Sequence, residues 1–238
     1  MKTRIHPAWI VAGITFGTLF ATAGFRSAPS VLILPLEDDF GWSRNVISLA
    51  VAINVLLFGL TAPFAAALME RFTVRKVVMA ALTTVGTGAL LTIWMSKSWH
   101  LLLLWGVVVG VGTGSMALVF AATIANRWFV KKRGLVIGIL TAAAASGQLV
   151  FLPGLSKLAE NPGWRASSLV IALGAYLMVP LIYFFLKEDP QSINAKPYGA
   201  EADWQPPVLQ TGNAAKNAIQ SLKDASTVSY THLRAHET

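Results

Sequence analysis

Residues 45–68 read NVISLAVAINVLLFGLTAPFAAAL, a continuous apolar run without a charged side chain. An α-helix crosses the hydrocarbon core of a bilayer with about 20 mostly apolar residues. The apolar side chains form one long block rather than alternating with polar ones, so the surrounding solvent is expected to be lipid. The run therefore predicts a transmembrane helix.

Five more segments of the chain have the same character. They are residues 8–36, 77–95, 101–124, 134–156 and 166–186. Prolines such as Pro63, Pro153 and Pro180 would break a helix in water, but in a membrane neighbouring helices satisfy the freed carbonyl groups. The sequence predicts an all-α membrane fold, a six-transmembrane-helix bundle over residues 1–187.

The overall composition agrees with a membrane protein. Apolar residues make up 55% of the chain and charged residues only 13%, whereas soluble proteins have about 25% charged residues. The net charge of +8 comes from short Lys and Arg clusters between apolar runs, which indicate membrane topology rather than a nucleic-acid surface. The chain has no cysteine, which excludes disulfides and thiolate metal sites. No constellation of catalytic groups indicates an enzyme, and we expect no cofactor or metal.

Cationic residues are distributed unequally between the two sides of the predicted helices. One side carries ten: Lys2, Arg4, Arg71, Arg75, Lys76, Arg127, Lys131, Lys132, Arg133 and Lys187. The other side carries four: Arg44, Lys97, Lys157 and Arg165. Cytoplasmic loops of membrane proteins carry the excess of Lys and Arg. The sequence therefore predicts a multi-pass protein of the cell inner (plasma) membrane with both termini in the cytoplasm.

The composition changes sharply after the last apolar segment. Residues 188–227 are rich in Asp, Glu, Pro, Gln, Asn and Ala, and we expect them to form a cytoplasmic linker. Residues 228–238 include SYTHLRAHET, which resembles translated sequencing-adaptor read-through, so we expect a non-native tail there. His232 and His236 lie four positions apart in this tail, but no third ligand supports a metal site.

Arg26 is the most informative polar residue, because it lies inside the first predicted helix. An arginine at the centre of a spanning helix costs about 2.5–3.5 kcal/mol, so it usually faces a polar cavity. Thr15, Thr18 and Thr22 share its helix face by their spacing. A hydroxyl stripe that leads to a guanidinium suits an anionic substrate, because the planar guanidinium binds a carboxylate through two hydrogen bonds. The alternative is that Arg26 snorkels to the outer interface.

Other polar and small residues inside the predicted helices allow two interpretations. Asn54 and Gln148 could each bind substrate or hydrogen-bond another helix, and we expect a structural role for Asn54 and a place in the substrate cavity for Gln148. Glycines at positions 106, 110 and 114 follow the small-xxx-small spacing that lets two helices approach closely.

The loop at residues 66–76 reads AALMERFTVRK. It resembles the signature of the major facilitator superfamily between its second and third helices, Gly-x-x-x-Asp-Arg-x-Gly-x-Arg-Arg. The charged positions of that signature are occupied here by Glu70, Arg71, Arg75 and Lys76. Both of its glycines are replaced, by Ala66 and Thr73. An ordinary cation-rich loop would explain the basic residues but not the pair Glu70–Arg71.

Further stretches are similar to bacterial members of the monocarboxylate-transporter-like branch of this superfamily. They are FRSA at 25–28, FGWSR at 40–44, NRWF at 126–129, KKRG at 131–134, GWR at 163–165 and the segment 190–199. The resemblance covers about residues 8–225. It implies a twelve-helix protein of two six-helix bundles, of which this chain would be the N-terminal half, truncated before the second bundle.

The resemblance also implies a mechanism of alternating access, in which two bundles rock about a substrate near the midplane. The substrate-binding residues would be Arg26, Thr22, Thr18 and Gln148. A conformational latch would consist of Glu70, Arg71, Arg75 and Lys76. A coupling proton would need a titratable membrane residue, and the six predicted helices contain no interior Asp, Glu or His. The expected partners are therefore a small-molecule solute, the lipid bilayer and the missing C-terminal bundle, which would have to supply any proton site, and not nucleic acid.

These observations support secondary active transport of a small organic anion, monocarboxylate-like, as the leading hypothesis. The alternative is a non-transporting six-helix membrane assembly or receptor subunit. Six more hydrophobic spans encoded beyond codon 227 would favour the transporter, whereas a stop codon followed by nothing apolar would favour the alternative.

Overall fold

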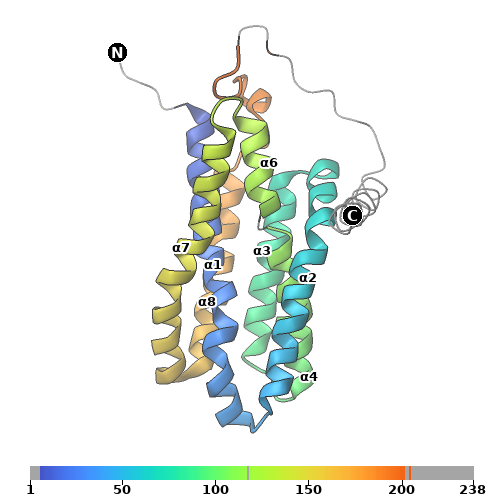
Figure 1. The fold of residues 1–238 in the computed structure, drawn as a ribbon, viewed down its shortest axis with the longest axis vertical. Helices are drawn as coiled ribbons and strands as arrows, with labels where there is room; N and C mark the ends of the chain where they lie inside the picture. The colour runs from blue at the N-terminus through green and yellow to red at the C-terminus, as the bar shows by residue number, and fades with distance from the viewer. Residues whose placement is uncertain (1–5, 117, 202–203, 205–238) are drawn as a thin grey trace, which may run out of the picture.

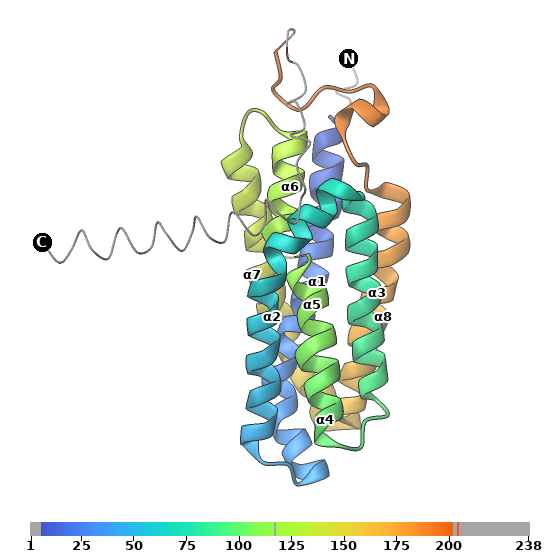
Figure 2. The same ribbon diagram turned by 90° about the vertical axis from the view of Figure 1, so that its right-hand side faces the viewer.

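The computed structural model describes residues 6–116, 118–201 and 204, which form an elongated bundle of helices (Figure 1 and Figure 2). The long helices are α1 (Pro7–Phe40), α2 (Arg44–Arg71), α3 (Val74–Thr92), α7 (Arg133–Leu158) and α8 (Trp164–Phe185). A further rod, Ser98–Trp128, consists of α4 (Ser98–Leu101), the π-helix η1 (Leu102–Val109), α5 (Gly110–Gly114) and α6 (Leu118–Trp128). Two short elements complete the order, the π-helical turn η2 (Ala159–Gly163) and the 3₁₀ helix η3 (Pro190–Ile193). The prediction of an all-α membrane fold is confirmed.

By length and hydropathy, the described residues contain five helices able to cross a membrane, whereas the sequence predicts six spans. The difference lies in Arg133–Phe185, a continuous stretch of 53 residues. A straight helix of that length would measure about 80 Å, far more than the hydrocarbon core of about 30 Å. The stretch is not straight, because Asn161 in η2 has extended backbone angles (φ −155°, ψ 115°) and the chain reverses there. Its two legs, α7 and α8, run in opposite directions and occupy the last two predicted spans (Figure 1).

α1 is the central helix of one half of the bundle, because it packs against both α7 and α8. Its buried apolar side chains include Val11 and Leu19. The two helices α1 and α7 approach closely at Gly147, where a Cβ atom would overlap the carbonyl oxygen of Phe20 and lie 2.7 Å from the Cβ of Ala23. Only glycine lets the two backbones pass at this distance.

The rod Ser98–Trp128 packs directly against α2. The spacing of its glycines predicts such a close approach of a neighbouring helix, and the structure identifies α2 as that helix. A Cβ at Gly110 would lie 3.0 Å from the Cα of Asn54, and one at Gly114 would overlap the side chain of Thr61. Asn54 Nδ2 donates a hydrogen bond of 2.7 Å to the carbonyl oxygen of Trp105, inside the π-helix η1. The amide thus links two helices, which supports the structural role expected for it.

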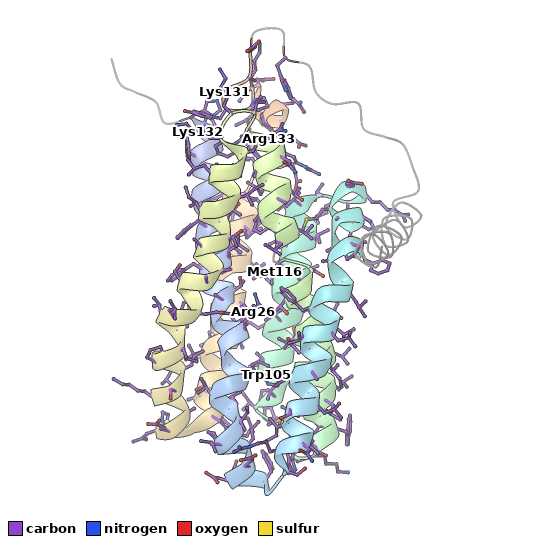
Figure 3. The ribbon with its side chains drawn as sticks, viewed as in Figure 1. Arg26, Trp105, Met116, Lys131, Lys132 and Arg133 are labelled. Carbon is purple, nitrogen blue, oxygen red and sulfur yellow. The ribbon has the colours of Figure 1, made fainter. Side chains whose placement is uncertain are left out.

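The two ends of the bundle differ in charge. One end of the bundle holds the beginning of α1, the end of α2, the loop between α6 and α7, and the end of α8. Figure 3 labels the cations at 131–133 there. At the opposite end, the carboxylate of Asp39 accepts hydrogen bonds from Trp164 Nε1 (2.9 Å) and Arg165 Nη1 (3.1 Å). These contacts fasten the end of α1 to the beginning of α8. We refer to the two as the cation-rich end and the cation-poor end.

The chain after α8 folds back over the cation-rich end. The N–H group of Tyr198 donates to the carbonyl oxygen of Trp128 (2.8 Å), and its own carbonyl accepts from the N–H of Val130 (2.9 Å). The Tyr198 ring lies 5.5 Å, between centroids, from the ring of His6 before α1. The first part of the predicted linker 188–227 is therefore attached to the bundle. Almost all of the remaining linker and the whole predicted tail lie outside the described residues.

Candidate functional site

Arg26 projects from α1 about halfway along the bundle (Figure 3). Its side chain is exposed, and the guanidinium carbon lies 4.5 Å from the centroid of the Phe58 ring on α2. A guanidinium over an aromatic face is stabilised by the electron-rich ring while its N–H groups stay available at the edges. Among the described carboxylates, none forms an ion pair with Arg26. The guanidinium is thus an accessible cation at mid-depth that does not extend to the outer end of its helix.

The three threonines that share the face of Arg26 are buried. Thr15 and Thr18 are at most 1% exposed and Thr22 is 8% exposed. Their hydroxyl groups donate to backbone carbonyls of the same helix, at 2.9, 2.9 and 3.1 Å respectively. The hydroxyl stripe therefore lies between packed helices in this conformation, whereas Arg26 lies at its exposed edge. Substrate binding by Thr18 and Thr22 stays a prediction.

Gln148 is half-buried on α7, directly after the glycine that contacts α1. One turn further, Phe151 closes the same contact, since a Cβ at Gly24 would lie 3.2 Å from its Cγ. Gln148 therefore lies between two residues of α7 that contact α1, the helix that carries Arg26. Its role in substrate binding also stays a prediction.

The four predicted latch residues are not gathered in one cluster. Arg75 is half-buried, and its Nη1 donates to the carbonyl oxygen of Tyr183 on α8 at 3.3 Å. Glu70, Arg71 and Lys76 are exposed, and within the described residues none of the three forms an ion pair. The structure thus connects one member of the set to the bundle interior and leaves three on its surface.

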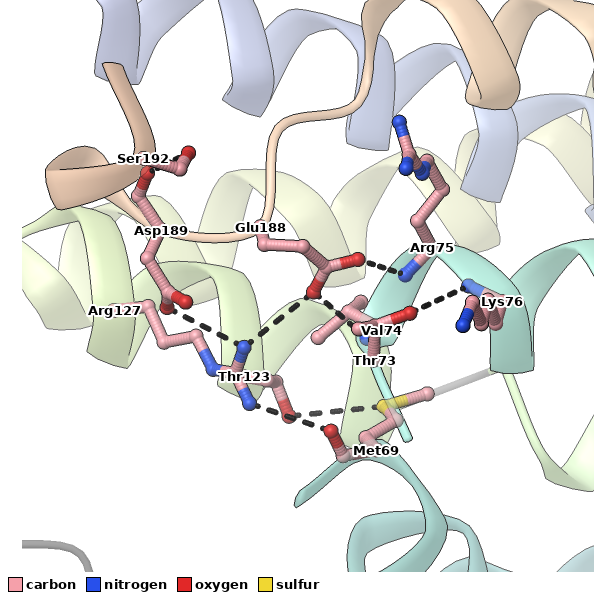
Figure 4. A network of polar contacts seen from close by, with 10 residues as sticks. All are labelled: Met69, Thr73, Val74, Arg75, Lys76, Thr123, Arg127, Glu188, Asp189 and Ser192. Carbon is pink, nitrogen blue, oxygen red and sulfur yellow. Dashed lines mark hydrogen bonds and ion pairs between the residues drawn. The ribbon is translucent and has the colours of Figure 1, made fainter. Parts of the chain in front are cut away.

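A carboxylate from the end of α8 holds the beginning of α3 (Figure 4). Glu188 Oε2 accepts a hydrogen bond from the N–H of Val74 (2.9 Å), and Oε1 accepts from the N–H of Arg75 (2.8 Å). The first N–H groups of a helix have no partner within the helix, and its N-terminus favours negative charge. Glu188 therefore caps α3 from outside that helix.

A cation from α6 completes this network. Arg127 Nη1 lies 3.6 Å from Glu188 Oε2 and 3.3 Å from Asp189 Oδ1. Its Nη2 donates to the carbonyl oxygen of Met69, near the C-terminus of α2, at 3.4 Å. The Arg127 side chain is only 24% exposed and that of Glu188 18%. One guanidinium thus connects α2, α6 and the chain after α8, and through Glu188 it also connects to α3.

Beside this network lies a cavity of about 400 Å³ at the cation-rich end. Its lining includes Glu70, Phe72, Arg127, Arg133, Glu188 and Gln191. The cavity combines charges of both signs with backbone from α2 and the chain after α8. Charged side chains of both signs therefore meet in one cavity where the end of α2 lies beside α6 and the chain after α8.

Sequence reasoning missed the two central members of the network. Arg127 was assigned only to a cation-rich loop, and Glu188 only to the linker. The available signal was an acidic pair, Glu188–Asp189, at the end of an apolar span on the side that collects cations. Their partners could not be read in this way, because Glu188 and Val74 are 114 positions apart in the chain.

Comparison with known proteins agrees with this architecture. The sequence profile of the Major Facilitator Superfamily matches residues 14–234. The uncharacterized MFS-type transporter YcxA of Bacillus subtilis is 25% identical over 206 residues, which cover 86% of this chain and 50% of that protein. Monocarboxylate transporter 7 of Homo sapiens is 29% identical over 69% of this chain and 31% of that protein. Monocarboxylate transporter 3 of Rattus norvegicus is 31% identical over 68% of this chain and 33% of that protein.

The chain spans half or less of the length of these relatives. The family match nevertheless covers nearly all of the bundle, the whole predicted linker 188–227 and the first residues of the predicted tail 228–238. The relatives are named as transporters and not as enzymes. With its long apolar helices, the chain is a multi-pass membrane protein, and it belongs to the major facilitator superfamily.

Proposed function

We propose that this chain is part of a secondary active transporter that carries a small organic anion, monocarboxylate-like, across the inner (plasma) membrane by alternating access. The observation that supports the anion is Arg26, an exposed guanidinium at mid-depth over the ring of Phe58. A permanent cation in this position offers two parallel hydrogen bonds to a carboxylate. The names of the two monocarboxylate transporters among the relatives point in the same direction.

The latch of this transporter would lie at the cation-rich end. Glu70, Arg71, Arg75 and Lys76 would make and break contacts with a second bundle as the two bundles rock. The network of Arg127 and Glu188 supports this proposal, because it fixes the ends of the helices from which the four latch residues project. Thr18, Thr22 and Gln148 would join Arg26 in the state that opens their helix contacts.

Uptake measurements test the role of Arg26. In cells that carry the complete gene, Arg26→Ala is expected to raise the half-saturating concentration of a transported monocarboxylate about tenfold, because a charge-assisted hydrogen bond is lost. Arg26→Lys is expected to recover part of this loss, since Lys keeps the charge but not the planar fork. Arg44→Ala is the matched control, because it removes a cation at the cation-poor end. Unchanged uptake in Arg26→Ala would refute the binding role. A well-expressed protein that moves no solute would favour a non-transporting assembly or receptor subunit.

The proposed orientation places the cation-rich end in the cytoplasm, since cytoplasmic loops carry the excess of Lys and Arg. The 238 residues of this chain contain no cysteine, so each introduced cysteine is the single thiol in this part of the protein. A membrane-impermeant maleimide is expected to label Lys97→Cys in intact cells and Lys132→Cys only after the membrane is opened. Labelling of Lys132→Cys in intact cells would reverse the proposed orientation.

A further inference from the structure

A second site lies on the side of the bundle shown in Figure 2, where α2, α5 and α3 are neighbours. A groove of about 340 Å³ opens there near the cation-rich end. Its lining includes Leu68 and Phe72 from α2, Lys76, Ala80 and Thr84 from α3, and Val111 from α5. Arg127 and Glu188 do not line this groove, so it is distinct from the cavity beside their network.

The walls of this groove offer no free hydroxyl hydrogen to a ligand, although two of the lining residues carry hydroxyl groups. The hydroxyl of Thr84 donates to the carbonyl of Ala80 and that of Ser115 to the carbonyl of Val111, each at 2.8 Å. Both hydroxyl hydrogens are therefore used within their own helices. The floor is closed at Gly112, where a Cβ would lie 2.6 Å from Cγ2 of Val85. A hydrocarbon chain suits such a groove better than a polar solute does, because it needs no hydrogen bond.

The mouth of the groove is cationic. Lys76 lines it with an exposed side chain. The Arg71 guanidinium lies 5.6 Å from the ring centroid of Phe72, which lines the same groove. Within the described residues no carboxylate pairs with either cation. Arg75 turns instead toward Tyr183. Lys76 therefore lines the groove itself, and Arg71 lies beside one of its lining residues.

The depth of the groove matches the layers of a bilayer. Lys76 lies in the first turn of α3, and Thr84 follows eight residues later on the same helix. Eight residues of α-helix rise about 12 Å. The cations thus stand at the level of lipid headgroups, while the apolar walls continue into the hydrocarbon layer.

We infer that this groove binds one anionic phospholipid. Lys76 and Arg71 bind its phosphate, and one acyl chain lies between α2, α3 and α5. Clustered cations next to apolar surface attract anionic lipids, which the cytoplasmic leaflet supplies. The inference uses the proposed orientation of the chain but not the proposed solute, and it assigns Arg71 and Lys76 to the lipid in the state in which the proposed latch is open. Ala80→Phe changes the groove without touching the latch or Arg26, so loss of lipid binding can be told apart from loss of uptake.

Native mass spectrometry of the complete gene product tests this inference. The protein is released from nanodiscs that contain equal amounts of phosphatidylcholine and phosphatidylglycerol, and the retained lipids are counted. One phosphatidylglycerol is expected to be retained in preference to phosphatidylcholine. Lys76→Gln and Arg71→Gln are each expected to weaken retention about fivefold, which corresponds to one cation near an anionic headgroup.

Two controls separate the groove from general attraction. Lys131→Gln combined with Lys132→Gln removes two exposed cations at the same end but away from the groove, and retention is expected to persist. Ala80→Phe fills the groove without changing charge and is expected to abolish retention, whereas Ala142→Phe on the exposed surface of α7 is not. Thermal melting of each variant confirms that it is folded.

Several outcomes would overturn the inference. They are equal retention of both lipids, equal loss in the Lys131/Lys132 control pair, retention that survives Ala80→Phe, or a second protein copy in place of the lipid. A melting temperature that drops in Ala80→Phe would be resolved by Ala80→Leu, which adds less volume and is expected to weaken retention in a folded protein.

Discussion

Gly147→Ala is expected to prevent recovery of a folded, monodisperse protein. The added methyl group would overlap the carbonyl oxygen of Phe20 and lie 2.7 Å from the Cβ of Ala23. A backbone carbonyl cannot rotate away as a flexible side chain can, so α1 and α7 must separate. Overpacking of this kind costs about 3 kcal/mol or more, a large fraction of the total stability of a typical protein. The measurements are yield, gel-filtration profile and thermal melting in detergent.

Gly138→Ala is the matched control on the same helix. No atom lies within 4 Å of a Cβ built at Gly138, so alanine fits there without displacing a neighbour. Alanine is the better helix former by about 1 kcal/mol, and the control is expected to melt at the same or a slightly higher temperature. If Gly147→Ala melts like Gly138→Ala, the close approach of α1 and α7 described above is wrong.

Glu188→Ala is expected to loosen the cation-rich end. The substitution removes the acceptor for two N–H groups at the start of α3, which alone costs about 0.5–2 kcal/mol. It also removes a carboxylate partner of Arg127, which is largely buried. From the two effects combined, we expect the free energy of unfolding to fall by about 2–3 kcal/mol, which lowers the melting temperature by roughly 5–10 °C. Thermal melting and protease sensitivity of the α2–α3 loop measure the effect.

A double-mutant cycle identifies the source of this loss. If Glu188 and Arg127 stabilise each other, Glu188→Ala combined with Arg127→Ala costs less than the sum of the two single changes. Glu201→Ala is the control with the same change in charge, because that side chain is exposed. Strict additivity of the cycle, or an equal loss in Glu201→Ala, would show that the ion pair contributes nothing specific.

Much of the fold could be predicted from the sequence. Each spanning helix makes its backbone hydrogen bonds within itself, and its long apolar run can be recognised without knowledge of its neighbours. The spacing of the glycines in the rod Ser98–Trp128 also predicted a close approach of another helix, although only the structure shows that this helix is α2. Asn54 followed from the same logic, because an amide in lipid requires a partner. These features are local in the chain, so periodicity reveals them.

The site was less accessible to prediction. Spacing placed Thr18 and Thr22 on the same helix face as Arg26. It could not show that the two threonines are buried between helices while the arginine is exposed. The latch signature identified the loop after α2 but not Arg127 and Glu188, which act on it from distant parts of the chain. Contacts between such residues depend on how the helices pack against one another, and a local sequence pattern does not reveal that packing.

The position of Tyr198 has a consequence for how such bundles can be joined. Its ring lies 5.5 Å from that of His6, so the segment after α8 returns to the corner where α1 begins. The beginning of α1 and the segment after α8 are thus neighbours on a single side of the lipid. A gene that encodes two such units in tandem needs only a short connecting peptide that never crosses the bilayer. Duplication of the unit would therefore place its second copy beside the first with the same side facing inward.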